Sequence, residues 1–468
     1  MFNRKEMLKM QKTQIKDFTQ GGITKQLLVF VWPLFLSNLL QVVYNMVDMI
    51  VVGNVLGKVG ISAVSVGGDL CNLLTFIAIG FSNAGQVLVA KYIGAGQKEK
   101  LGRFTGTMCS FLLSSALVIS VISIIFQDAL LKFMQTPDAA YKDAAEYSLI
   151  CMIGLVFIYG YNMVSAVLRG MGDSKHPFIF VSLAAAMNIV LDIIFVAVIG
   201  MGAKGAALAT VISQGTSFLM CALFLFVKRK EFELDAKPRD FLIPEKEMLK
   251  SLVKLGIPMA IKMASVQISK LFVNSQINAY GVEVSAFSGI ANKISSISNL
   301  ISAAMNTAGS TMVGQNISAG KEERVKKILK TLAVITLSVS TFISIIFLFF
   351  QNEIIGFFAD GDQSVVAVGE HFFIIAVLLF YASAMRAIMN ALLNGSGNTK
   401  VNFATAIFDG IIMRFGLAIL FGMVLNMEYY GFWLGDALAG FTPFVIGTVF
   451  YVTGSWKKNM PSKLPSKA

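Results

Sequence analysis

Two polar residues interrupt an otherwise apolar stretch, MNIVLDIIFV at 187–196, and they are the first candidates for chemistry. Asn188 and Asp192 are four residues apart, so on a helix they project from the same face. Asp48 lies in a second apolar stretch, and Thr210 follows the small-residue run GAKGAALAT in a third. Together these side chains could supply carboxylate, amide and hydroxyl oxygens to one site. Such oxygens suit a hard cation such as Na⁺, and two carboxylates in a poorly solvated pocket equally suit proton carriage.

An acid within an apolar segment needs a physical reason. Placing Asp at the middle of a membrane helix costs about 2.5 to 3.5 kcal/mol, so such residues usually face a partner or a wet cavity. The alternative is a protonated Asp that makes one local hydrogen bond. That alternative applies more readily to Asp69, Asp409 and Asp436 than to Asp48 and Asp192.

The elements that must position these residues are membrane helices. The 468 residues are 56% hydrophobic and only 14% charged, whereas a soluble protein is nearer 25% charged. Each apolar segment reaches about 20 residues, enough to cross roughly 30 Å of hydrocarbon. We expect twelve of them, near 27–50, 60–90, 104–127, 144–168, 177–199, 205–227, 252–279, 285–312, 331–351, 369–393, 402–424 and 431–454. The predicted fold class is therefore an all-α integral membrane protein.

The basic residues predict an orientation in the membrane. Twenty-nine of the 39 Lys and Arg residues fall in the N-terminal segment, the loops after even-numbered segments and the tail, and only four fall in the opposite loops. The positive-inside rule then puts both termini in the cytoplasm, with the protein in the plasma membrane. The net charge of +12 reflects this topology, so a nucleic-acid partner is not needed to explain it.

The sequence also repeats itself with an offset of 224 or 225 residues. AVLRGMGDSK at 166–175 matches ALLNGSGNTK at 391–400 at five of ten positions, and Pro33 and Pro258 occupy equivalent places. Each copy holds six segments, so the copies are expected to be parallel repeats around a central cleft. The expected division is an N-terminal segment, an N-terminal lobe, a cytoplasmic linker, a C-terminal lobe and a tail, at 1–26, 27–227, 228–250, 251–454 and 455–468.

Polar residues recur at helical spacing in several segments, which predicts faces turned toward water or another helix. One alternative is ordinary hydrogen bonding between helices. The second copy also carries basic residues at membrane depth, so one lobe is predicted to be acidic inside and the other basic. Arg414 is expected to pair with Asp409 or Asp436. The residues expected to line a substrate cavity are Gln41, Asn45, Gln267, Lys270, Asn274, Lys293 and Arg386.

At this point a family resemblance is visible over about residues 20 to 455. The resemblance rests on several motifs that occur in a fixed order along the chain, among them VDMIVVGNVLG (47–57), LVAKYIGAG (88–96), VLRGMGDSKHP (167–177) and LLNGSGNTK (392–400). The chain resembles the multidrug and toxic compound extrusion (MATE) transporters. The resemblance implies two six-helix lobes in a V shape and cation-driven export.

The resemblance also implies a site. In the branch whose ion site lies in the N-terminal lobe, the ligand positions match Asp48, Asn188, Asp192 and Thr210 of this chain. A second branch uses acids on the seventh and tenth helices. Here the seventh helix has Gln267 and the tenth has no acid at mid-span, so the second site is not expected.

The resulting prediction is an exporter of small organic molecules, not an enzyme, driven by H⁺ or Na⁺ through alternating access, with Pro33 as a hinge in the first helix. The cargo is expected to include anionic or zwitterionic compounds as well as cationic ones. No metal or other cofactor is expected, membrane lipid is the expected surrounding, and the chain is expected to be a monomer. The alternatives are a flippase of lipid-linked precursors and an intramembrane enzyme. The enzyme would need a nucleophile, base or metal set that the two histidines, His176 and His371, do not provide.

Overall fold

The computed structural model describes residues 14–235, 237–359 and 362–461, and all regular elements within them are helices. The predicted all-α fold class is therefore confirmed. The parts of the predicted N-terminal segment at 1–13 and of the predicted tail at 462–468 lie outside the described residues.

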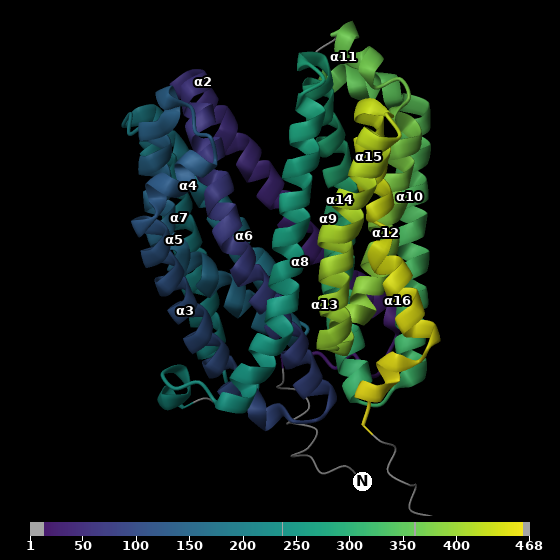
Figure 1. Ribbon diagram of the computed structural model, residues 1–468. Coiled ribbons are helices and arrows are strands. Elements are labelled where there is room, and N and C mark those ends of the chain that lie inside the picture. Colours follow the sequence, from purple (N-terminus) through teal and green to yellow (C-terminus); the bar gives the residue numbers. More distant parts are fainter. Residues whose placement is uncertain (1–13, 236, 360–361, 462–468) are drawn as a thin grey trace, which may run out of the picture. The chain divides into compact units, whose positions relative to one another are not determined.

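The chain divides into two compact units. The N-terminal unit comprises Trp32–Ala260 with the described residues before Phe18, and the C-terminal unit comprises Phe18–Val31 and the chain from Ile261 onward. Each unit is a bundle of long helices that lie side by side (Figure 1). The elements of the N-terminal unit are most of α2 (Ile23–Gly94), η1 (Lys98–Lys100), α3 (Leu101–Ile125), α4 (Gln127–Phe133), α5 (Asp138–Gly170), α6 (Lys175–Asp192), η2 (Ile193–Val198), α7 (Ala203–Val227), η3 (Pro238–Phe241) and the start of α8 (Lys246–Asn278).

The C-terminal unit has the same kind of construction. Its elements are the rest of α8, α9 (Val282–Ser318), α10 (Glu322–Phe358), α11 (Gln363–Val368), α12 (Phe372–Ser396), α13 (Thr399–Ile407), η4 (Phe408–Met413), α14 (Arg414–Ala418), η5 (Ile419–Val424), α15 (Glu428–Ala439), α16 (Thr442–Val452) and η6 (Ser455–Asn459).

Helix α2 contains two membrane crossings. Its 72 residues would extend about 108 Å if straight, far more than a bilayer core. Gly57 divides it with a φ of 65° and a ψ of −158°, a backbone conformation that glycine adopts without a Cβ clash. The described residues contain ten helical stretches long and apolar enough to cross a membrane. Counting α2 twice and adding the long, more polar α9 gives the twelve crossings that the sequence predicts.

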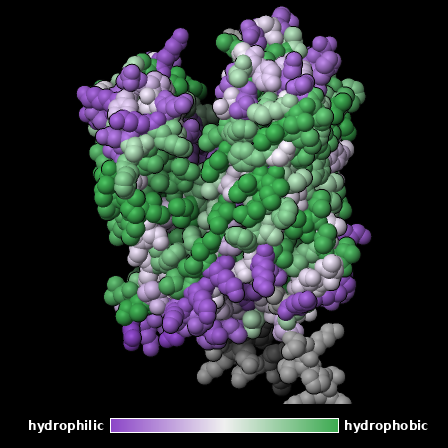
Figure 2. All heavy atoms as spheres, viewed as in Figure 1, coloured by the Kyte–Doolittle hydropathy of each residue, from purple (hydrophilic) through white to green (hydrophobic). Residues whose placement is uncertain are grey.

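The surface of each unit fits this topology. In Figure 2, hydrophobic residues cover the middle of each unit and hydrophilic residues gather at its two ends. On α3, for example, Leu117, Val118, Val121 and Ile122 are all more than half exposed. Large exposed apolar faces are unusual for a soluble monomer and are typical of a membrane protein.

Each unit contains a close helix contact at a glycine, and the two glycines are at equivalent positions of the sequence repeat. A Cβ on Gly170 of α5 would lie 2.7 Å from the carbonyl oxygen of Gln86. A Cβ on Gly395 of α12 would lie 2.7 Å from the carbonyl oxygen of Ser310. The glycines are 225 residues apart and their contacts 224 apart, so the sequence repeat corresponds to a repeated packing contact.

We therefore expect Gly395→Ala to lower the free energy of unfolding by about 1 to 3 kcal/mol, because the methyl group must displace backbone of α9. Gly289→Ala is the matched control, since nothing lies within 4 Å of a Cβ at that helical position. The control should be neutral or slightly stabilising, because Ala favours helix over Gly. Thermal unfolding in detergent measures both, and equal melting temperatures for the two variants would contradict the packing argument.

The segment that leads into α2 is hydrogen-bonded to α9 and α10 of the C-terminal unit. Arg324 of α10 donates from Nη1 to the carbonyl oxygen of Gly21 and from Nη2 to that of Phe18, each at 2.9 Å. The backbone N–H of Phe18 donates to Gln315 Oε1 at 2.8 Å. Helix α2 then continues into the N-terminal unit at Trp32.

Candidate functional site

The deepest acids of the N-terminal unit lie on α2 and at the end of α6. Asp48, Asn188 and Asp192 are 9%, 3% and 0% exposed. One carboxylate oxygen of Asp48, both amide atoms of Asn188 and both carboxylate oxygens of Asp192 have no hydrogen-bond partner among the described residues. Buried polar groups are normally paired, so these three side chains have binding capacity that the fold itself does not use.

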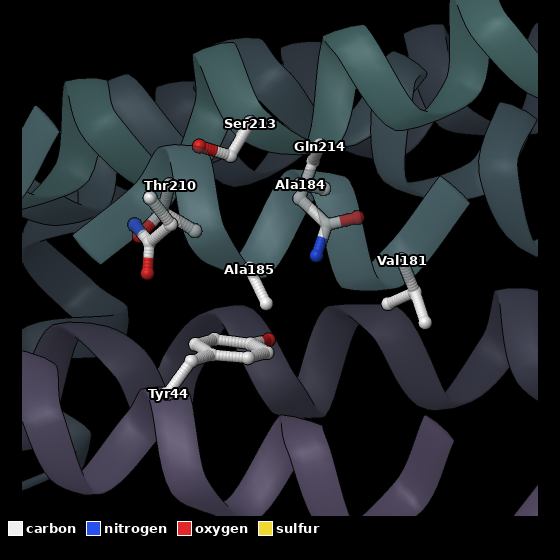
Figure 3. Close-up of a pocket in the computed structure, with 8 residues that line it drawn as sticks. Tyr44, Val181, Ala184, Ala185, Thr210, Ser213 and Gln214 are labelled. Carbon is white, nitrogen blue, oxygen red and sulfur yellow. The ribbon is translucent and has the colours of Figure 1, made fainter. Parts of the chain in front are cut away.

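Asn188 and Asp48 line two adjoining spaces inside the unit, and Asp192 lines neither of them. A narrow pocket of about 10 Å³, enough for about one water molecule, is lined by Asn188, Thr210, Ser213 and Tyr44 among others. Figure 3 shows Tyr44 of α2 across this pocket from Thr210 and Ser213 of α7. Asp192 follows Asn188 by four residues at the end of α6.

A larger space, which we call the acidic cavity, adjoins the narrow pocket. It measures about 470 Å³ and shares Tyr44, Thr210 and Gln214 with the pocket as lining residues. Asp48 and Asp69 line it, and no Lys or Arg is among its described lining residues. Its interior therefore favours a positive charge, whether a bound cation or a proton.

The helix that carries Asp192 changes its winding directly after that residue. Segment η2 is a π-helix, and its counterpart η5 stands 226 residues later in the C-terminal unit. Short π-helical segments are rare and often occur at functional sites. Helix α6 is therefore regular up to Asp192, and the wider π-helical turns begin at the next residue.

The predicted hinge residue sits in regular helix. Within α2 the only non-helical backbone is at Gly57, so the chain runs through Pro33 without a break. The hydroxyl of Ser37 donates to the carbonyl oxygen of Pro33 at 2.8 Å. Pro33 lacks a backbone N–H, so one hydrogen bond of the helix is missing there.

The residues expected to line a substrate cavity fall into separate groups. Gln41 and Asn45 line the acidic cavity. Lys270 and Asn274 line a different, smaller pocket in the C-terminal unit. The remaining three candidates line neither space: Gln267, Arg386 and Lys293.

Two of those three have identified partners. Arg386 donates from Nη2 to Asn299 Oδ1 at 2.8 Å. Lys293 is exposed, and its ammonium group lies 5.6 Å from the centre of the Phe358 ring.

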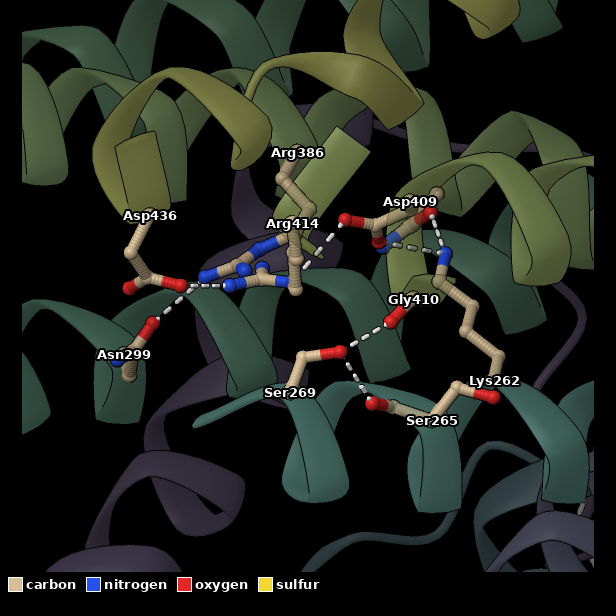
Figure 4. Close-up of polar contacts among 10 residues, drawn as sticks. Lys262, Ser265, Ser269, Asn299, Arg386, Asp409, Gly410, Arg414 and Asp436 are labelled. Carbon is tan, nitrogen blue, oxygen red and sulfur yellow. Dashed lines mark hydrogen bonds and ion pairs between the residues drawn. The ribbon is translucent and has the colours of Figure 1, made fainter. Parts of the chain in front are cut away.

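The C-terminal unit holds a buried ion cluster (Figure 4). The Nε atom of Arg414 lies 3.5 Å from Asp409, and its Nη1 atom donates to Asp436. Lys262 lies 4.0 Å from Asp409 and donates to Asn390 at 2.7 Å. The sequence predicted one acid partner for Arg414, and the structure gives it both.

Several residues of the acidic cavity were not selected from the sequence. Tyr44 precedes Asp48 by four residues, and Gln214 follows Thr210 by four, so helical spacing was a usable signal for both. Tyr147 also lines the cavity, and a Cβ on Gly67 would lie 2.5 Å from its ring. No sequence pattern pointed to Tyr147, because its position depends on how α5 packs against α2.

Comparison with known proteins identifies the family. The family model described as MatE matches residues 33–194 and 258–424, and the two matches begin at the equivalent prolines Pro33 and Pro258. The probable multidrug resistance protein YpnP of Bacillus subtilis (strain 168) is 28% identical over 94% of this chain and 97% of its own. The probable multidrug resistance protein NorM of Thermotoga maritima is 24% identical over 93% of this chain and 94% of its own.

Solved structures agree on the fold. A MATE protein in the bent conformation matches with a TM-score of 0.85 at 23% identity, over 94% of this chain and 98% of its own. A MOP superfamily transporter from Pyrococcus furiosus Vc1 (DSM3638) matches with a TM-score of 0.87 at 24% identity, over 96% and 99%. The family model matches more than half of the chain, in two stretches, so the chain belongs to the MatE family of membrane transporters.

Proposed function

We propose that this protein exports small organic molecules, drugs among them, across the plasma membrane, and that inward flow of H⁺ or Na⁺ through the N-terminal unit drives the export. The observation that carries the proposal is the set of buried, unpaired oxygens on Asp48, which lines the acidic cavity, on Asn188, which lines the adjoining narrow pocket, and on Asp192. The relatives YpnP and NorM, named as probable multidrug resistance proteins, support the exporting role.

In the proposed cycle, a cation enters from outside and neutralises Asp48 and Asp192. Cation binding shifts the equilibrium between two conformations of the protein because the cation binds one conformation more tightly than the other. Thr210 and Asn188 supply neutral oxygen ligands, and α2, with its missing hydrogen bond at Pro33, is the helix that rearranges. The protein acts as a monomer surrounded by lipid, with both termini in the cytoplasm.

The test uses purified protein in liposomes with ethidium as a cationic fluorescent probe. A pH gradient and a Na⁺ gradient are imposed separately, each in the direction that should drive export, and probe movement is followed against liposomes without protein. We expect movement with at least one gradient and its collapse when an ionophore dissipates that gradient. Movement that is the same with and without both gradients would contradict cation coupling.

A further inference from the structure

The interior of the C-terminal unit has more positive than negative charge. Its embedded cations are Lys262, Lys270, Arg386 and Arg414, while the acids that face them are Asp409 and Asp436. Two acids against four cations leave two formal positive charges without an acidic counterpart among the described residues of this cluster.

The ion pairs show which cations lack a counterpart. Asp409 lies between Lys262 and Arg414, and Asp436 pairs with Arg414. Arg386 has the neutral amide of Asn299 as its hydrogen-bond acceptor. Lys270 makes no hydrogen bond and no ion pair within 4.0 Å in the described part of the chain. It is only partly exposed, on the same helix as Lys262.

Lys270 opens onto a space of suitable size. This space, which we call the lysine pocket, measures about 30 Å³, and its polar lining residues are Lys270, Asn274, Asn292, Ser295 and Asp436. Phe372 and Trp433 form part of its apolar wall, and their rings pack edge to face with centres 5.3 Å apart. Since one water needs about 10 to 15 Å³ by this measure, the lysine pocket has room for about two oxygen-sized atoms.

The charges around the lysine pocket favour a negatively charged ligand. A buried ammonium group is costly unless an opposite charge and hydrogen bonds compensate it. The one acid that lines the pocket, Asp436, is already paired with Arg414, so its charge is offset within the described cluster. A carboxylate group has two oxygens and one negative charge, which match both the room and the unpaired ammonium.

We propose that the lysine pocket binds a carboxylate group, with Lys270 as its charge partner and the amides of Asn274 and Asn292 as its polar neighbours. The carboxylate belongs either to a larger cargo molecule, whose body lies outside the pocket, or to a free small anion. The first case rests on the proposed export function and makes anionic or zwitterionic compounds its substrates. The second case, a free small anion, does not depend on the proposed export function.

The experiment measures binding by calorimetry to the full-length protein in detergent, with no gradient present. The probes are phenylacetate, its neutral isostere phenylacetamide, and acetate. We expect phenylacetate to bind about tenfold or more tightly than phenylacetamide, because a hydrogen-bonded charge pair is stronger than a neutral contact. Acetate as tight as phenylacetate would assign the pocket to a free anion, and weaker acetate would assign it to a cargo carboxylate.

Variants of Lys270 complete the test. Lys270→Met should remove the preference for phenylacetate, and Lys270→Arg should retain it. Lys254→Met, an exposed position earlier on the same helix, is the matched control and should leave the preference unchanged. Without added anion, Lys270→Met should melt no lower than wild type, because it removes an uncompensated charge.

A wild-type protein without the preference, or a preference that survives Lys270→Met, would overturn the proposal. Carboxylate binding in a protein that moves no probe under any gradient would refute the proposed function and leave this site standing. Gradient-driven ethidium movement without carboxylate binding would refute the carboxylate site and leave the proposed function standing.

Discussion

Asp192→Asn and Asp48→Asn are each expected to reduce gradient-driven export in liposomes by about 5- to 150-fold, the range of typical coupling free energies. Each substitution keeps the size of the side chain and removes its ability to take up a proton or neutralise a cation. Because Asp192 is completely buried with both oxygens unpaired, its loss should be the more severe of the two.

The control for this prediction is Asp128→Asn on α4. Asp128 is exposed and accepts a hydrogen bond from the Tyr141 hydroxyl at 3.1 Å, an acceptor role that the amide oxygen of Asn retains. Its export rate should equal that of wild type. Wild-type rates for both Asp48→Asn and Asp192→Asn, at equal amounts of reconstituted protein, would eliminate these acids from the coupling mechanism.

Arg414→Leu is expected to destabilise the protein by about 3 to 5 kcal/mol, the largest effect on stability that we expect from a single substitution. Arg414 is 1% exposed and pairs with Asp409 and Asp436, so its removal leaves Asp436 without an ion-pair partner in the described chain. The leucine is apolar and cannot solvate a carboxylate. The measurement is the midpoint of thermal unfolding in detergent.

A second variant separates lost charge pairing from lost packing. Adding Asp436→Asn to Arg414→Leu removes the stranded carboxylate, so the double variant should recover part of the lost stability. If packing alone mattered, the second substitution would give no recovery. An Arg414→Leu protein as stable as wild type would contradict the role of the ion cluster.

Much of this architecture could be predicted because membrane burial constrains sequence strongly. The apolar segments predicted the all-α membrane fold class, and the sequence repeat, with Pro33 and Pro258 at equivalent positions, predicted two related units. Asp48, Asn188 and Asp192 stood out because an unneeded acid or amide at membrane depth is costly. The assignment of these residues to a coupling ion stays a prediction.

Other features depended on packing that no local pattern encodes. Arg414 follows Asp409 by five residues, yet it also reaches Asp436 on α15, 22 residues later. The π-helical winding of η2 and η5 leaves no mark in composition, since IIFVAV and ILFGMV read as ordinary apolar helix. Tyr147 joins the acidic cavity only because Gly67 lets α5 approach α2 closely.

The attachment of Phe18–Val31 to the C-terminal unit has a consequence for how the molecule can be assembled. The start of α8 up to Ala260 is exchanged in the opposite direction, so a polypeptide cut in the loop before α8 would yield two fragments, each carrying a piece of the other's core. Each repeat therefore includes the leading helical turns of the other, as each protomer of a domain-swapped dimer does.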